Sequence, residues 1–114
     1  MKEEQIVKIR EVLQKDEVKE VVNYLATKNG VKYNLTKTAE ELIELAEVCL
    51  KMANKKPDLA PPKSALIEEL GDVLFRTEVL VKSLDINIED INERVYYKAK
   101  KYLEWVKNER FSEI

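Results

Sequence analysis

Two acidic segments with the periodicity of α-helices organise this chain: Thr38-Ala39-Glu40-Glu41-Leu42-Ile43-Glu44-Leu45-Ala46 and Ile67-Glu68-Glu69-Leu70-Gly71-Asp72-Val73-Leu74-Phe75. Each segment places two carboxylates three positions apart, Glu41 with Glu44 and Glu69 with Asp72. Residues at this spacing share one side of a helix, and here apolar residues surround them. Four such carboxylates brought together would form a site for a hard cation such as Mg²⁺, which prefers oxygen ligands.

Composition predicts a single, mostly helical domain. The chain has 114 residues, of which 45% are hydrophobic and 37% are charged, with only two glycines and three prolines. A chain of this length can bury a small core and gains stability from oligomerisation. The net charge of −2 favours neither nucleic acid polymers nor acidic membranes as partners. From the single cysteine and the absence of a signal-peptide pattern or a membrane-spanning apolar run, we expect a cytoplasmic protein.

The absence of histidine narrows the chemistry. It excludes a Ser-His-Asp triad, a histidine-ligated zinc ion and the Glu-x-x-His di-iron site of helical bundles. Cys49, the single thiol, has no histidine to activate it as a nucleophile. Carboxylates are therefore the remaining candidates for metal ligands.

The N-terminal region is predicted to be helical. Residues 3–28 lack glycine and proline, and their two apolar stripes are offset between Leu13 and Val18. Two short helices that meet near Lys15 and one bent helix explain this offset equally well. Gly30 should end the region, and residues 31–35 should form a connector.

The next helix should begin at Thr36 or Thr38 and end at Asn54. Its main apolar face should be formed by Ala39, Leu42, Ile43, Ala46, Cys49, Leu50 and Ala53. At about 100° per residue, Glu41 lies in a second apolar sector, which also holds Leu45, Val48 and Met52. A carboxylate there is costly to bury unless a positive charge meets it. A purely structural alternative is a capping box between Thr38 and Glu41.

The proline-rich segment 55–62 should be a loop, followed by a helix over residues 63–84. The core face of that helix should be formed by Leu66, Ile67, Leu70, Val73, Leu74, Val81 and Leu84. Phe75 and Val79 emerge on nearly the opposite side, which predicts a second cover supplied by another subunit. Glu69, Asp72 and Arg76 share a flank. If this helix packs antiparallel on the preceding one through their apolar faces, both carboxylate pairs can line one cleft.

Asn87 is a suitable N-cap for a last helix over residues 88–108. Its core face should be formed by Ile88, Ile91, Val95, Ala99, Tyr102 and Val106. Lys98 falls inside this stripe beside Trp105, where a lysine either extends its charged end to water or meets an anion. Arg76 also has two interpretations, a salt bridge to a neighbouring carboxylate or a phosphate contact. Trp105 and the tyrosines are more typical of a core than of a nucleobase platform.

These residues carry a resemblance to a known family. Glu40-Glu41-Leu-Ile-Glu44-Leu-Ala followed by Glu68-Glu69-Leu-Gly-Asp72-Val-Leu-Phe resembles the Glu-Glu-x-x-Glu … Glu-x-x-Asp signature of the MazG-like all-α NTP pyrophosphohydrolases. Lys98-Ala-Lys-Lys101 is similar to a lysine-containing motif on the last core helix of that superfamily. We therefore expect a MazG-like domain over residues 30–114, preceded by an N-terminal helical extension over residues 1–29. Arg76 is not expected in most relatives, and the absence of histidine argues against a close phosphoribosyl-ATP pyrophosphohydrolase.

The resemblance implies an all-α helical bundle whose four-helix core is completed by dimerisation, in a homodimer or homotetramer. It implies hydrolysis of a nucleoside triphosphate to the monophosphate and pyrophosphate. It also implies Mg²⁺, with Mn²⁺ as a substitute, held by Glu41, Glu44, Glu69 and Asp72. Substrate phosphates would be bound by Lys98, Lys101 or Arg76. Glu40 or Glu68 would orient water or a ligand.

Two other interpretations fit the same residues. One is a non-catalytic helical dimer that acts as a binding or regulatory module, motivated by the helix over residues 63–84 with apolar residues on two sides. The other is a relative that binds nucleotide and metal without catalysis. Stabilisation by metal separates an enzyme from the first alternative, and turnover separates it from the second.

Overall fold

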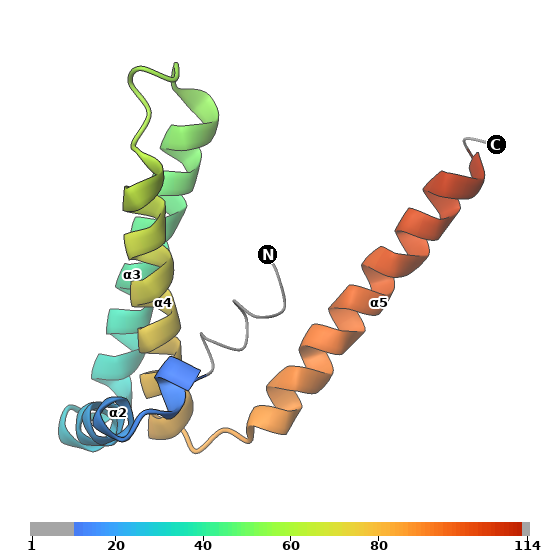
Figure 1. The fold of residues 1–114 in the computed structure, drawn as a ribbon. Helices are drawn as coiled ribbons and strands as arrows, with labels where there is room; N and C mark the ends of the chain where they lie inside the picture. The colour runs from blue at the N-terminus through green and yellow to red at the C-terminus, as the bar shows by residue number, and fades with distance from the viewer. Residues whose placement is uncertain (1–10, 113–114) are drawn as a thin grey trace.

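The computed structural model describes residues 11–112, and every regular element in this part of the chain is an α-helix. A helical turn at residues 11–14 is followed by α2 (Asp16–Lys28), α3 (Gly30–Asn54), α4 (Lys63–Ser83) and α5 (Ile88–Ser112). α3 and α4 run side by side, α2 lies across one end of this pair, and α5 extends away from it (Figure 1). The predicted all-α fold class is confirmed.

α3 and α4 form an antiparallel pair because the proline-rich loop over residues 55–62 reverses the chain between them (Figure 1). The half-buried apolar residues of α3 are those of the second sector, Leu45, Val48 and Met52. The main apolar face predicted for α3 is instead exposed, as Leu50 at 61% shows, and Ile67 of α4 is 60% exposed. The predicted main face of α3 was therefore wrong for a single chain. The predicted face of α4 was partly right, because Leu66, Val73 and Val81 are half-buried.

The buried core joins α2 to α4. Val22 and Ala26 of α2 and Val79 of α4 are the buried apolar residues in the described chain, and Phe75 packs beside them. The prediction that another subunit covers Phe75 and Val79 was wrong, because α2 of the same chain covers them. The chain bends at Lys15, which confirms two helices in this region. The part of the predicted N-terminal helix before residue 11 lies outside the described residues.

α3 begins earlier than its sequence predicts. Gly30, with φ +80°, ends α2 in the left-handed conformation that glycine tolerates, and α3 starts at that residue, so the predicted connector over residues 31–35 is helical. Asn34 is fully buried, and its Nδ2 donates a hydrogen bond to the Leu25 carbonyl of α2 at 3.2 Å. The Thr38 hydroxyl donates to the Asn34 carbonyl at 2.7 Å. Thr38 is therefore inside the helix, which excludes a capping box with Glu41.

α5 is capped as predicted but stands apart from the other helices. The Glu89 amide donates a hydrogen bond to Asn87 Oδ1 at 3.0 Å, which confirms Asn87 as the N-cap. Over the described residues, α5 makes no extensive contact with α2, α3 or α4 (Figure 1). Most of its predicted core face is therefore exposed, with Val95 at 63% and Tyr102 at 60%, whereas Ile91 and Val106 are half-buried. In the described region, no helix combines the length and apolar character needed to cross a membrane.

Candidate metal centre

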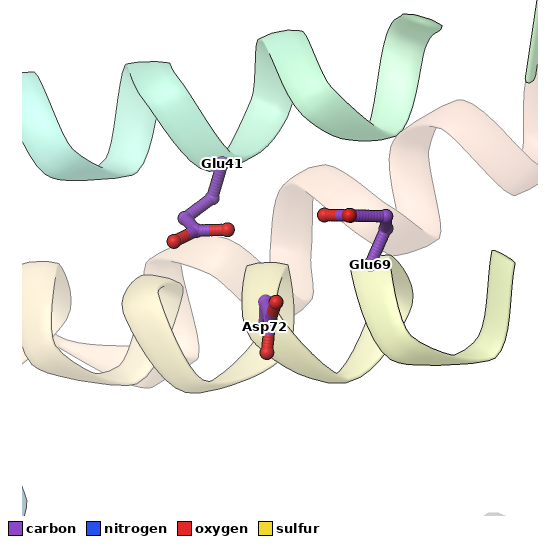
Figure 2. A group of neighbouring side chains, drawn as sticks. All are labelled: Glu41, Glu69 and Asp72. Atoms are coloured by element: carbon purple, nitrogen blue, oxygen red, sulfur yellow. The ribbon is translucent and has the colours of Figure 1, made fainter. Parts of the chain in front are cut away.

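Three carboxylates from two helices meet between α3 and α4, and we call them the acidic cluster. Glu41 projects from α3, and Glu69 and Asp72 project from successive turns of α4 (Figure 2). One carboxylate oxygen of each residue lies within 4.8 Å of the other two. Glu41 and Glu69 are half-buried and Asp72 is exposed, so solvent and ligands can reach the cluster from the Asp72 side. The acidic segments are thus brought together, as their matching positions predict.

Burial and mutual repulsion disfavour ionisation of this cluster. Removal from water raises the pKa of Glu41, the negative charges of Glu44 and Asp72 raise it further, and the positive charge of Arg76 offsets part of this. Removal from water likewise raises the pKa of Glu69, with Glu44, Asp72 and Glu41 adding to the effect. Both carboxyl groups therefore hold a proton more tightly in the folded chain than in water. A cation bound among them would reverse this preference.

Two oxygen atoms of the acidic cluster are buried without a hydrogen-bond partner among the described residues: Oε2 of Glu41 and Oε2 of Glu69. Buried polar atoms in folded proteins almost always have a partner, so an unpaired carboxylate oxygen indicates a ligand. Carboxylate oxygens are the protein ligands that Mg²⁺ favours. The donor set and its two unpaired oxygens therefore fit a magnesium site.

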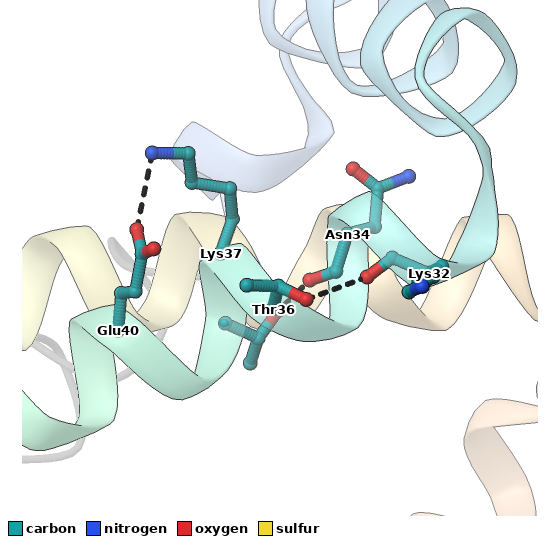
Figure 3. Close-up of polar contacts among 6 residues, drawn as sticks. Lys32, Asn34, Thr36, Lys37 and Glu40 are labelled. Carbon is teal, nitrogen blue, oxygen red and sulfur yellow. Dashed lines mark hydrogen bonds and ion pairs between the residues drawn. The ribbon is translucent and has the colours of Figure 1, made fainter.

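The other predicted acidic residues lie at different distances from the cluster. Glu44 is exposed at its edge, where its charge raises the pKa values of Glu41 and Glu69. Glu40 is not part of the cluster and forms a salt bridge with Lys37, at 3.0 Å between Oε2 and Nζ (Figure 3). Glu68 is exposed, and its charge contributes to the raised pKa of Glu69.

Arg76 lies beside the cluster without being paired to it. It is half-buried on α4, four residues after Asp72, and its charge reaches Glu41. Within the described part of the chain it forms no salt bridge with Glu69 or Asp72, which argues against the first interpretation of Arg76, a salt bridge to a neighbouring carboxylate. Its Nη1 atom is buried and has no hydrogen-bond partner among the residues that the structure describes. A buried guanidinium donor of this kind is suited to an incoming anion.

The two predicted lysines are not brought to the acidic cluster within one chain. Lys98 and Lys101 lie on α5, where they line a shallow hollow of about 420 Å³ with Arg94, Tyr102 and Trp105. Lys101 also places its Nζ 5.2 Å from the centre of the Tyr97 ring, a cation–π contact. Because α5 diverges from α3 and α4, these lysines can meet an acidic cluster only through a further contact (Figure 1).

Lys37 is a residue of the site region that sequence reasoning did not single out. It precedes Glu41 by four positions, so both side chains lie on one side of α3. The charge of Arg76 lowers the pKa of Lys37, although the hydrogen bond to Glu40 raises it more. The i, i+4 spacing to Glu41 could have indicated from the sequence that Lys37 lies on the same side of the helix as the site. That the charge of Arg76 reaches Lys37 depends on the register of α3 against α4, which the sequence does not show.

Comparison with known proteins agrees with this geometry. Residues 29–106 match the family model described as the MazG nucleotide pyrophosphohydrolase domain, a segment that contains the acidic cluster. Over 65 residues the chain is 38% identical to a Bacillus subtilis (strain 168) protein, "Uncharacterized protein YpjD", an alignment that covers 56% of this chain and 59% of that relative. No solved structure is significantly similar to the chain. The chain belongs to the MazG nucleotide pyrophosphohydrolase domain family.

Proposed function

We propose that the protein is a Mg²⁺-dependent nucleoside triphosphate pyrophosphohydrolase, which converts a (d)NTP into the (d)NMP and pyrophosphate. The observation that carries this proposal is the acidic cluster of Glu41, Glu69 and Asp72. The cluster lies within the segment that matches the family model, and two of its buried oxygens have no hydrogen-bond partner in the described part of the chain. The relative from Bacillus subtilis is uncharacterised, so the activity rests on the family and on this site.

We assign four carboxylates as the residues that would hold Mg²⁺, or Mn²⁺ in its place: Glu41, Glu44, Glu69 and Asp72. When bound, the ion would neutralise phosphate charge and lower the pKa of a water molecule for attack on phosphorus. The chain fixes its carboxylates on two packed helices, so little rearrangement accompanies binding. Since the pKa values of Glu41 and Glu69 are raised, protons compete with the ion for these ligands. Glu40 or Glu68 is proposed to orient water or a ligand.

We propose that Arg76, Lys98 and Lys101 bind substrate phosphates. Arg76 already lies beside the acidic cluster, whereas the two lysines belong to α5. The lysines can act on the same substrate if α5 packs against the α3–α4 pair of a second copy. Residues 1–29 are proposed as an extension to the catalytic domain, with α2 stabilising α4 through the buried core.

We propose a homodimer, or a homotetramer of two such dimers. Large apolar side chains are exposed on α3, α4 and α5, including Leu50, Ile67 and Trp105, each between 57% and 61% exposed. A soluble monomer rarely exposes apolar surface on three helices, so a second copy is the expected cover. Size-exclusion chromatography with light scattering tests this: a dimer or tetramer is expected, and a monomer at micromolar concentration would contradict it.

Release of pyrophosphate from a panel of NTPs and dNTPs, with Mg²⁺ and with EDTA, tests the proposed activity. Metal-dependent release is expected and ranks the bases and sugars. The non-catalytic binding module was motivated by Phe75 and Val79 as a partner surface, and α2 occupies that surface. Absence of release from every nucleotide, with the protein folded and Mg²⁺ present, would favour such a module or a relative that only binds nucleotide.

A further inference from the structure

Two cationic side chains flank the same end of the acidic cluster. Arg76 follows Asp72 by four residues on α4, and Lys37 precedes Glu41 by four residues on α3. Because α3 and α4 are antiparallel, four residues toward the C-terminus of α4 and four residues toward the N-terminus of α3 lead to the same end of the helix pair (Figure 1). The positive charge of Arg76 acts on Glu41 and also on Lys37, so Arg76 lies within electrostatic reach of each of them.

The Arg76 side chain has unused hydrogen-bonding capacity. Its Nη1 is buried with no hydrogen-bond partner, and it forms no salt bridge within the described residues. A guanidinium group offers five donors in a fixed fork, and leaving one of them buried and unpaired is costly. An anion with at least two oxygen atoms would satisfy that fork.

Lys37 is available to the same anion. Its Nζ is 3.0 Å from Glu40 Oε2, and the two side chains are 37% and 52% exposed (Figure 3). Exposed ion pairs on one helix contribute little to stability, so exchange of Glu40 for a more highly charged anion costs little. The salt bridge to Glu40 thus orients the Lys37 side chain and leaves its ammonium group able to bind an anion.

We propose that Arg76 and Lys37 form a phosphate-binding site at this end of the acidic cluster, which binds the phosphate chain of the substrate and the pyrophosphate product. The identity of the ligand rests on the proposed function. Arg76 supplies a bidentate contact to two phosphate oxygens, and Lys37 supplies a second positive charge. The site differs from a metal site because its contribution persists when divalent cations are removed.

A simpler role for Arg76 would be to neutralise Glu41. In that case its removal would affect the stability of the chain and the ionisation of Glu41, and the affinity for a phosphate anion would not depend on it. Binding of inorganic pyrophosphate in EDTA distinguishes the two roles. The variant Glu41→Gln is the appropriate background, because the neutral amide lowers the repulsion between the acidic cluster and the anion while Arg76 and Lys37 remain.

Isothermal titration calorimetry of the full chain with inorganic pyrophosphate in EDTA is the test. In the Glu41→Gln background we expect saturable binding that becomes weaker by about tenfold or more when Arg76→Gln is added, and by a smaller factor with Lys37→Gln. Lys82→Gln, on the exposed side of α4, is the matched control for loss of one positive charge and should leave the affinity unchanged. Circular dichroism checks that each variant keeps its helicity.

Equal weakening by Arg76→Gln and Lys82→Gln, or no saturable binding in the Glu41→Gln background, would overturn the inference. The nucleotide panel separates this failure from failure of the proposed function. Metal-dependent hydrolysis by the wild-type chain, combined with pyrophosphate affinity independent of Arg76, would overturn the inference alone. Affinity for pyrophosphate that depends on Arg76, in a chain that hydrolyses no nucleotide, would overturn the proposed function alone.

Discussion

Replacing Glu41 by glutamine should stabilise the metal-free protein while it removes the response to Mg²⁺. The substitution keeps the shape of the side chain and deletes one negative charge from the acidic cluster. In the wild-type chain, burial and the neighbouring carboxylates both disfavour the charged form of Glu41. A site built for a cation should therefore gain stability in EDTA when one of its ligands becomes neutral.

The size of this gain follows from the spacing in the cluster. Glu41 lies within 4.8 Å of two carboxylate oxygens. Two unit charges at that separation repel by about 1 kcal/mol in water and by about 3 kcal/mol at an effective dielectric constant of about 20. The cluster is open to solvent on one side and Arg76 offsets part of the repulsion, so we take the lower figure. A gain of about 1 kcal/mol corresponds to a rise in Tm of about 4 °C for a chain of this size.

Thermal unfolding followed by circular dichroism, in EDTA and in Mg²⁺, measures this effect. Mg²⁺ at about a hundred times its Kd should stabilise the wild-type chain by about 2.7 kcal/mol and Glu41→Gln by much less, so the order of Tm values should reverse. Glu47→Gln, an exposed carboxylate of α3, is the matched control and should show neither change. A Glu41→Gln variant less stable than wild type in EDTA, or a gain shared by Glu47→Gln, would refute the reasoning.

Two further predictions follow from burial and hydrogen bonding. The pKa values of Glu41 and Glu69 are raised above 4.5, so in EDTA the stability that these groups contribute is fully present below that pH and is lost as the pH rises through the raised pKa values. Urea unfolding in EDTA should therefore show that the free energy of unfolding falls across this pH range, and that Mg²⁺ or Glu41→Gln makes the fall smaller. A free energy of unfolding that rises across this range would contradict the prediction. Asn34→Ala removes the part-buried hydrogen bond from the Asn34 side chain to the Leu25 carbonyl of α2 and should lower the free energy of unfolding in urea by about 2 kcal/mol. Thr36→Ala, which removes an exposed hydroxyl bond, should cost almost nothing, and equal costs would contradict this assignment.

The acidic pairs were predictable because their geometry is local. Glu41 and Glu44, like Glu69 and Asp72, are fixed by helical spacing, and the proline-rich loop dictated an antiparallel return. The displacement of Glu41 from the main apolar face also followed from about 100° per residue. These features sufficed to predict that the carboxylates would face one another.

Other features depend on packing that periodicity does not encode. The polar residues Asn34 and Thr38 lie inside α3, where Asn34 hydrogen-bonds to the Leu25 carbonyl of α2 and Thr38 to the Asn34 carbonyl. The apolar residues on the far side of α4 predicted another subunit as the cover of Val79, but periodicity does not say which element packs there, and in the structure α2 does. The apolar stripe of α5 does not determine where this helix packs. The positions of Lys98 and Lys101 on α5 could therefore not be predicted from it. The charge of Arg76 reaches Lys37 only through the register of α3 against α4.

The most direct test of the central claim is phosphorus NMR of the products formed from the preferred nucleotide in Mg²⁺. We expect resonances of the nucleoside monophosphate and pyrophosphate with the wild-type chain. Asp72→Asn should lower the rate by about a hundredfold or more while helicity is retained, because it removes a ligand from the acidic cluster, whereas Asp58→Asn in the exposed loop should have no effect. Formation of nucleoside diphosphate and inorganic phosphate, or unchanged turnover by Asp72→Asn, would contradict the account.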